Sequence, residues 1–144
     1  MNNLSFHITD IMTNSIRAKA SEIGLFIEER DLRITIRIAD NGLGMDAGTI
    51  ARVTNPFYTT RTTRKVGLGI PFLIQNAEQT GGAVSITSQP GKGTVVTASF
   101  CSNHIDCPPW GDLPGTVAML ITGNPDINIC FEYQAVKTVF SIST

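Results

Sequence analysis

The sequence RITIRIADNGLGM at residues 33–45 decides how the chain is expected to fold. Its first half alternates isoleucine with other residues, which is typical of a strand with one buried face. The alternation ends at Asp40, and two glycines spaced by one residue follow at Gly42 and Gly44. One interpretation is a type I′ turn that closes a hairpin, but no alternating strand follows Met45. The other is a loop whose bare backbone lies against a planar ligand while the carboxylate accepts from an exocyclic amine.

The periodicity of apolar residues around this segment predicts an α/β arrangement. It assigns helices over 4–21, 46–53 and 70–81, and strands around 23–27, 34–38, 83–88 and 94–100. A polar turn at 28–31 joins the first two strands, and Asp46 is expected to cap the short helix. We therefore expect a two-layer α/β (α+β) sandwich, in which a mixed sheet of about four or five strands carries the helices on one face.

The last third of the chain differs in character from the rest. Residues 101–111 include two adjacent prolines, and Asp112 is expected to cap a helix over 116–122. Alternation then predicts a closing hairpin over 127–142. We expect residues 1–100 to form the main domain and residues 101–144 to form a helix and hairpin extension packed on the same sheet, because about 44 residues make a poor independent core.

Length and charge exclude several classes of function. The chain has 144 residues, 42% of them apolar, and its 11 basic side chains nearly balance 12 acidic ones. A net charge of -1 gives no broad basic surface for nucleic acid. The apolar runs are far shorter than the roughly 18 residues of a membrane span, and three cysteines form no disulfide framework. We expect a cytoplasmic protein that binds neither nucleic acid nor a membrane.

A polar stripe on the first predicted helix carries groups that suit a phosphate ligand. Asp10, Asn14 and Arg17 follow one another at spacings of four and three, which places a proton acceptor, an oxygen ligand and a guanidinium on one face. One asparagine can anchor Mg²⁺, because this ion keeps waters and phosphate oxygens as its other ligands. The alternative interpretation is the solvated side of an amphipathic helix. For His7, one turn earlier, we expect a polar-face or capping role.

A second glycine-rich turn, Gly67 to Gly69, opens the predicted helix at Ile70 and Pro71. Backbone N–H groups at a helix N-terminus form an anion site. The turn does not follow a strand and lacks Gly-Lys-Ser/Thr, so it is neither a dinucleotide-binding fingerprint nor a Walker loop. The preceding residues 59–65 supply three cations and four hydroxyls within seven positions. The near-neutral net charge of the whole chain does not reveal this local cluster of positive charge.

Cys101, His104 and Cys107 place three potential metal ligands within seven residues. Their spacing matches none of the usual zinc patterns, so we interpret them as a chance cluster on a proline-rich turn. Trp110, between a proline and a glycine, is expected to pack the extension onto the core.

Taken together and in order, these motifs resemble the histidine kinase-like ATPases of the Bergerat fold, the superfamily shared with gyrase-type topoisomerases, ninety-kilodalton chaperones and mismatch-repair ATPases. The boxes fall in order, the N-box at 10–20, the G1 box at 40–45, the F-box at 55–61, the G2 box at 67–70 and the closing turn at 91–94. The resemblance covers about residues 4–100 and implies the Bergerat ATP-binding fold.

The resemblance also implies ATP and Mg²⁺ as ligands. It implies that Asn14 coordinates Mg²⁺ and that Asp40 binds the adenine amino group, with Thr94 in support. By its position, Asp10 is then the candidate catalytic base, and residues 55–65 would form a mobile lid. The residues implied to contact the nucleotide are Asn14, Arg17, Ala18, Asp40, Gly42, Gly44, Met45, Phe57, Thr59, Thr60, Arg61, Lys65, Gly67, Leu68, Gly69, Ile70 and Thr94.

The chain departs from the family pattern at three points. Members that hydrolyse ATP typically have a glutamate where Asp10 stands, and many sensor kinases have a second Gly-x-Gly where Lys65 and Val66 stand. No helical hairpin with a phospho-accepting histidine accompanies the boxes, so we expect a stand-alone module.

Three hypotheses about function follow from this resemblance. The first is an ATP-dependent protein kinase of histidine or serine type, or an ATPase, that acts on a separate partner protein. The second is a non-catalytic, anti-sigma-like module that ATP switches between partner-binding states. The third is a scaffold that has lost ATP binding. A homodimer is compatible with each of them.

Overall fold

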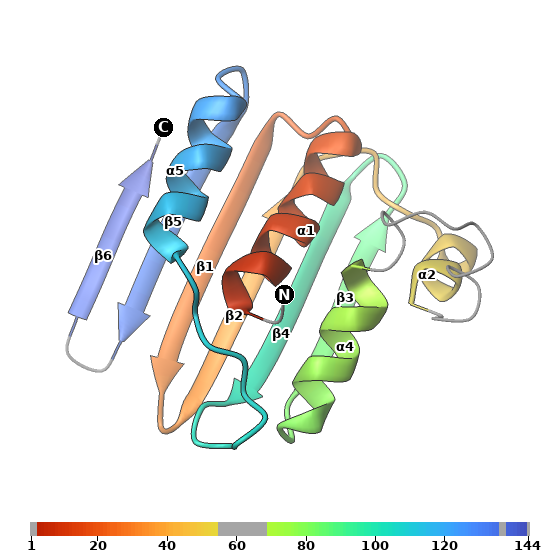
Figure 1. Cartoon of the computed structure of the whole chain (residues 1–144). Helices are drawn as coiled ribbons and strands as arrows, with labels where there is room; N and C mark the ends of the chain where they lie inside the picture. The colour runs from red at the N-terminus through yellow and green to blue at the C-terminus, as the bar shows by residue number, and fades with distance from the viewer. Residues whose placement is uncertain (1–2, 55–68, 136–137, 144) are drawn as a thin grey trace.

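The computed structural model describes residues 3–54, 69–135 and 138–143 (Figure 1). The helices in these residues are α1 (Leu4–Arg17), α2 (Ala47–Val53), α4 (Gly69–Gln79) and α5 (Leu113–Gly123). The strands are β1 (Glu22–Arg30), β2 (Arg33–Asp40), β3 (Ala83–Gln89), β4 (Gly93–Cys101), β5 (Asn128–Ala135) and β6 (Thr138–Ser143).

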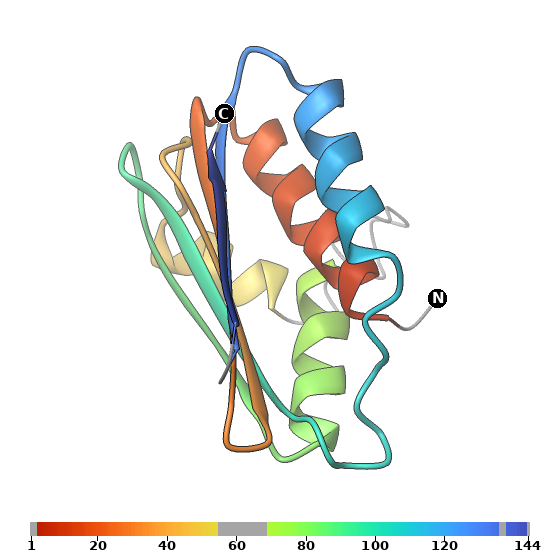
Figure 2. The same ribbon diagram turned by 90° about the vertical axis from the view of Figure 1, so that its left-hand side faces the viewer.

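All six strands form one mixed sheet in the order β3-β4-β2-β1-β5-β6. Strand β5 runs parallel to β1, and the other pairs are antiparallel. Figure 2 shows the sheet edge-on, with α1, α4 and α5 in a second layer on one face. The predicted two-layer α/β architecture is therefore confirmed. None of the helices in the described residues has the length and apolar character needed to cross a bilayer.

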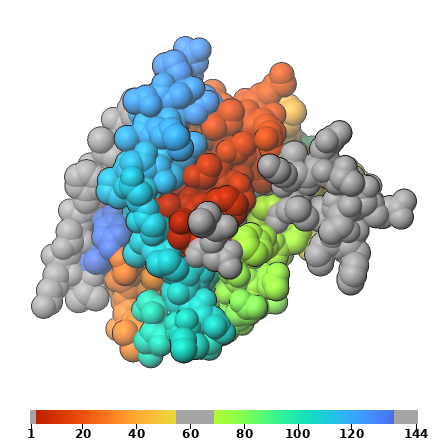
Figure 3. Space-filling model, in the orientation of Figure 1, coloured from red at the N-terminus to blue at the C-terminus, as the bar shows by residue number. Residues whose placement is uncertain are grey.

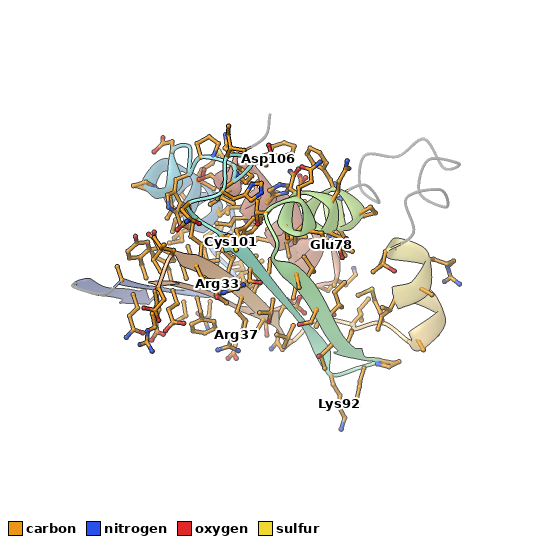
Figure 4. The ribbon with its side chains drawn as sticks, turned by 90° about the horizontal axis from the view of Figure 1, so that it is seen from below. Arg33, Arg37, Glu78, Lys92, Cys101 and Asp106 are labelled. Carbon is orange, nitrogen blue, oxygen red and sulfur yellow. The ribbon has the colours of Figure 1, made fainter. Side chains whose placement is uncertain are left out.

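The core lies between the sheet and the helix layer. Ile34, Ile36 and Ile38 of β2 are all nearly inaccessible to solvent, as the alternation predicted. The register places Leu25 beside Ile38 and thereby aligns the apolar sides of β1 and β2 on one face. The opposite face carries Arg37, whose guanidinium carbon lies 4.4 Å from the centroid of the Phe26 ring. Figure 4 shows Arg37 projecting away from the helices.

Helix α1 ends at Arg17, four residues before the predicted end. Lys19 has a φ of 63°, in the left-handed region that stops a helix. The amide groups of Ser21 and Glu22 donate to Oδ1 of Asn41 at 2.9 and 3.0 Å instead of continuing the helix. The predicted helix was too long because its end is set by Asn41, which lies twenty positions beyond Ser21 and cannot be recognised from the local sequence.

The turn between β1 and β2 is also shorter than predicted. Both strands continue to the pair Arg30 and Arg33, and only Asp31 and Leu32 lie between them, with φ values of 53° and 63°. Two positive φ values match the twist of a two-residue hairpin. The polar residues 28–30 that suggested a turn therefore belong to β1.

The C-terminal elements extend the main sheet. Asp112 caps α5 by accepting from the Gly115 amide at 3.1 Å, and the helix begins at Leu113 rather than at residue 116. Strand β5 then enters the sheet beside β1. Trp110 packs against the core, its carbonyl accepts from the hydroxyl of Ser5 at 2.6 Å, and its ring lies 6.4 Å from that of Tyr133.

His7 lies buried between α1 and α4, with only 1% of its surface exposed. The expected polar-face position is wrong because α4 packs over this side of α1. Its Nε2 is 2.7 Å from Nδ2 of Asn76, and its ring centroid is 5.3 Å from that of Phe72. With the amide in this orientation, Nε2 accepts and Nδ1 carries the proton, without a hydrogen-bond partner among the described residues. Burial lowers the pKa of His7 from 6.5 to about 4.

We expect the free energy of unfolding to fall as the pH is lowered from about 6.5 to about 4. Between these values the unfolded chain binds a proton at His7 that the folded chain excludes, so its stabilising effect is complete above pH 6.5 and is lost below it. The full difference corresponds to roughly 3 kcal/mol.

Urea unfolding at several pH values measures this dependence. A His7→Gln variant, which keeps a hydrogen-bonding group but cannot titrate, should lose most of the slope between pH 6.5 and 4. The same slope in both proteins would show that His7 is not its source.

Candidate functional site

Asp40 ends β2 and is held by two hydrogen bonds to its carboxylate. Oδ2 accepts from the hydroxyl of Ser15 on α1 at 2.6 Å, and Oδ1 accepts from the amide of Gly42 at 2.8 Å. Ser15 is buried and Asp40 is partly buried, so this bond is only partly exposed to water. Each carboxylate oxygen has a second lone pair. Asp40 can therefore accept a further hydrogen bond from a ligand in a fixed direction.

The loop after Asp40 is clamped between α1 and the turn that joins β3 to β4. The amide of Leu43 donates to the carbonyl of Ala18 at 2.8 Å, and the amide of Gly91 donates to the carbonyl of Leu43 at 2.6 Å. A Cβ atom on Gly42 would lie 2.7 Å from the Ala18 carbonyl oxygen. Gly44 has a φ of 74°, and a Cβ atom there would overlap the carbonyl oxygen of Gln89. Other backbone segments therefore lie so close to positions 42 and 44 that only glycine fits there.

Thr94 lies directly opposite Asp40 in the antiparallel register of β2 and β4. Its hydroxyl oxygen is 2.7 Å from that of Ser88, which in turn accepts from the Met45 amide at 2.7 Å and donates to the Gly93 carbonyl at 3.0 Å. Thr94 is thus linked to the loop through Ser88. No hydrogen bond from Thr94 to the Asp40 carboxylate is found among the described residues.

Asp10 lies where α1 meets the first residue of α4. A Cβ atom on Gly69 would be 3.2 Å from the Asp10 Cβ and 3.6 Å from its Oδ2. Burial raises the pKa of Asp10, and the charge of Arg17 on the last turn of α1 partly opposes this. A carboxylate whose pKa is raised by burial at such a junction is a candidate proton acceptor.

Asn14 lies one helical turn from Asp10 on α1 and is partly buried. A carboxamide and a carboxylate supply the oxygen donors that Mg²⁺ prefers, and this ion needs few protein ligands. The pair therefore fits Mg²⁺ by its donor chemistry. Within the described part of the chain, no cluster of three or more His, Cys, Asp and Glu residues could hold a metal ion, and Cys101, His104 and Cys107 form none.

Of the predicted nucleotide contacts, one group lies together in the structure, and another group falls in residues that the structure does not describe. The residues that gather around α1, the loop at 41–45, the start of α4 and the start of β4 are Asp10, Asn14, Arg17, Ala18, Asp40, Gly42, Gly44, Met45, Gly69 and Thr94. Ile70 is buried in the core. The residues that lie outside the described ranges are Phe57, Thr59, Thr60, Arg61, Lys65, Gly67 and Leu68.

Two serines of the site were missed from the sequence. Ser15 follows the buried Ile8 and Ile11 at helical spacing, and Ser88 follows Val84 and Ile86 at the alternate positions of β3. Each serine continues a row of apolar residues, which indicates a buried hydroxyl. A buried hydroxyl needs a hydrogen-bond partner, and this could have identified both serines as residues that hold the site.

Comparison with known proteins assigns this chain to a class of ATP-binding domains. A family model described as "Histidine kinase-, DNA gyrase B-, and HSP90-like ATPase" matches residues 3–103. The chain belongs to this family, and it contains a histidine kinase-like ATP-binding domain.

Two relatives illustrate the similarity in sequence. The chain is 30% identical over 106 residues to "Sensor histidine kinase YxdK" of Bacillus subtilis (strain 168), an alignment that covers 67% of this chain and 32% of that protein. It is 35% identical over 93 residues to "Sensor protein kinase FleS" of Pseudomonas aeruginosa, covering 62% of this chain and 23% of that protein. The chain thus matches a third or less of the length of either relative.

A solved structure shows the same fold at low sequence identity. It is described as "Crystal Structure of N terminal domain of a DNA repair protein" and aligns with a TM-score of 0.61 and 19% identity. The alignment covers 99% of this chain and 52% of that one. It therefore extends beyond the region of the family model to α5, β5 and β6.

We expect Gly44→Ala to destabilise the protein far more than Gly91→Ala. Both glycines have positive φ, but a Cβ atom on Gly91 would meet nothing within 4 Å, whereas one on Gly44 would overlap backbone. The strain of positive φ alone costs about 1 kcal/mol, and the overlap should add at least about 2 kcal/mol at Gly44. Urea unfolding of the two variants measures the difference, and equal losses would show that the loop can move away from β3.

Proposed function

We propose that the chain binds Mg-ATP at the site built around Asp40, Asn14 and Asp10, and that it acts as a protein kinase or regulatory ATPase on a separate partner protein. The single observation that supports this most is the Asp40 carboxylate, fixed by Ser15 and Gly42 and directed from the end of a central strand. Family membership supplies ATP as the ligand.

In this proposal each element of the site has one task. Asp40 accepts a hydrogen bond from the exocyclic amine of adenine, and the loop at 41–45 presents bare backbone to the base. Asn14 holds Mg²⁺ through its side-chain oxygen, and the ion, when bound, neutralises phosphate charge. The N-terminal amides of α4, starting at Gly69, meet the phosphates. Asp10 orients the attacking group of the partner protein, or a water, and accepts its proton.

The alternative is a non-catalytic, anti-sigma-like module in which bound ATP only controls partner binding. The aspartate in place of the family's usual glutamate favours this alternative, since its carboxylate reaches one methylene less far. The raised pKa of Asp10 and its contact with Gly69 favour catalysis. Both alternatives share the same nucleotide site.

The other expectations accompany this proposal. We propose that residues 1–100 form the nucleotide-binding domain and residues 101–144 an extension of its sheet, with β5 beside β1 as support. We also propose a cytoplasmic location, a protein partner and no nucleic-acid ligand. The near-neutral charge supports the last of these.

Asp40→Asn should weaken ATP binding by roughly 10- to 100-fold, because a charge-assisted hydrogen bond of about 1.5–3 kcal/mol is lost. Isothermal titration with Mg-ATP measures the affinity. Asp46→Asn is the matched control, since Asp46 is exposed and caps α2 through Thr49, a role that asparagine also fills. Unchanged affinity in Asp40→Asn would place the nucleotide elsewhere.

Asp10→Asn separates the two alternatives. If the chain is an enzyme, this variant should bind Mg-ATP with nearly the affinity of the wild type but lose at least about 100-fold in hydrolysis or phosphoryl transfer. Labelled ATP measures release of phosphate and transfer to partner proteins. Wild-type turnover no higher than that of Asp10→Asn would reject the enzyme and favour the nucleotide-switched module.

A further inference from the structure

Three groups around Ser88 use all of its hydrogen-bonding capacity. Its oxygen accepts from the Met45 amide at 2.7 Å, its hydroxyl donates to the Gly93 carbonyl at 3.0 Å, and its oxygen lies 2.7 Å from that of Thr94. A hydroxyl has one hydrogen and two lone pairs, and a carbonyl can only accept. The hydrogen of Ser88 therefore goes to Gly93, and the hydrogen between the two hydroxyls belongs to Thr94.

This assignment fixes the hydrogen-bonding character of Thr94. Its hydrogen is used on Ser88, while its oxygen keeps two lone pairs. Thr94 is only partly buried, so part of its side chain is open to a ligand. A ligand group that meets the Thr94 oxygen must then be a hydrogen-bond donor.

Ser88, Thr94 and Asp40 form a row across three neighbouring strands. Thr94 lies opposite Ser88 in the pairing of β3 with β4, and opposite Asp40 in the pairing of β4 with β2. Each member stands two positions from an apolar core residue of its own strand, so the row is on the helix-facing side of the sheet. Helix α1, which lies between α5 and α4 on this face, supplies Ser15 to the Asp40 end (Figure 3).

Backbone packing holds Thr94 beside Asp40. A Cβ atom on Gly93 would overlap the carbonyl oxygen of Asp40, so the start of β4 lies directly against the end of β2. Side chains opposed in an antiparallel pair have Cβ atoms about 5 Å apart, close enough for a hydroxyl to donate to a carboxylate. Thr94 donates to Ser88 instead. Ser88 thus keeps the Thr94 hydrogen away from Asp40, whose remaining lone pairs stay free for a ligand.

The two acceptors, Asp40 and Thr94, suit the two hydrogens of one amino group. Two acceptors that each lie about 2.9 Å from the nitrogen of an NH₂ group are about 5 Å apart. Opposed side chains in an antiparallel pair have this same spacing of about 5 Å. A ligand oxygen at the place of the nitrogen would meet lone pairs on both sides, which repel it.

On the basis of the proposed nucleotide site, we propose that Ser88 is a positioning residue that makes this site specific for a base with an exocyclic amino group. Asp40 accepts one hydrogen of the amine. Thr94, held as an acceptor by Ser88, accepts the other. Ser88 does not touch the nucleotide. Without Ser88, Thr94 can turn its hydrogen to Asp40, where it competes with the amine.

The test compares ATP with purine riboside 5′-triphosphate, which has a hydrogen atom in place of the exocyclic amine. Isothermal titration in the presence of Mg²⁺ measures both affinities for the wild type, Ser88→Ala and Ser85→Ala. Ser85→Ala is the matched control, because Ser85 is an exposed serine of the same strand. It lies an odd number of residues from Ser88 and so on the other face of the sheet. Thermal unfolding checks that the variants fold.

Ser88→Ala should weaken ATP binding by roughly 3- to 10-fold, the effect of one neutral hydrogen bond. It should leave the affinity for purine riboside triphosphate unchanged. A serine that only held the loop at 41–45 would weaken both ligands equally, because the Met45 amide loses its acceptor in either case. Ser85→Ala should change neither affinity, and Ser88→Thr, which keeps the hydroxyl, should keep the wild-type preference for ATP.

Thr94→Val gives a second measurement that does not depend on the folding of Ser88→Ala. It removes the acceptor oxygen of Thr94 but leaves a side chain of similar shape in β4. It should weaken ATP binding by a similar factor and again leave purine riboside triphosphate unaffected.

Two results would overturn the inference while ATP binding stands. One is an equal loss of affinity for both ligands, or no loss, in Ser88→Ala and Thr94→Val. The other is a wild type that binds ATP and purine riboside triphosphate equally well, since the row would then not recognise the amine. A wild type that binds neither ligand would reject the proposed function itself and the inference with it.

Discussion

The hydrogen bond from the Ser15 hydroxyl to the Asp40 carboxylate is the interaction on which the site depends. It ties the buried Ser15 of helix α1 to the end of strand β2 at 2.6 Å. The same carboxylate accepts from the Gly42 amide and so fixes the start of the glycine loop. Because Asp10 and Asn14 are on α1 as well, one bond sets the distance between the proposed adenine contact and the proposed metal and catalytic groups.

A second contact sets the relation of α1 to α4. The buried pair His7 and Asn76 joins the two helices one turn before Asp10, and Gly69 brings the first turn of α4 against Asp10 itself. Because Gly69 has no Cβ atom, α4 can approach the Asp10 side chain closely, since a Cβ there would lie 3.2 Å from the Asp10 Cβ. Burial at this junction has two effects, since it keeps His7 neutral and raises the pKa of Asp10. The packing of α1 against α4 thus affects the pKa values of both His7 and Asp10.

Local patterns predicted most of the fold and the order of the site motifs. Alternation located β2 and its Asp40, and the caps of α2 and α5 followed from Asp46 and Asp112. Features set by distant residues were missed. The end of α1 depends on Asn41, and the burial of His7 depends on the packing of α4. Ser15 and Ser88 were missed for the same reason, because their roles depend on partners in other elements.

The central claim is that Ser15 acts on nucleotide binding through Asp40, and a double-mutant cycle tests it most directly. Mg-ATP affinity is measured by titration for the wild type, Ser15→Ala, Asp40→Asn and the double variant. The account predicts that Ser15→Ala weakens binding in the wild type but has almost no further effect once Asp40 is changed, with a coupling of about 1 kcal/mol or more. Additive effects of the two changes would contradict it.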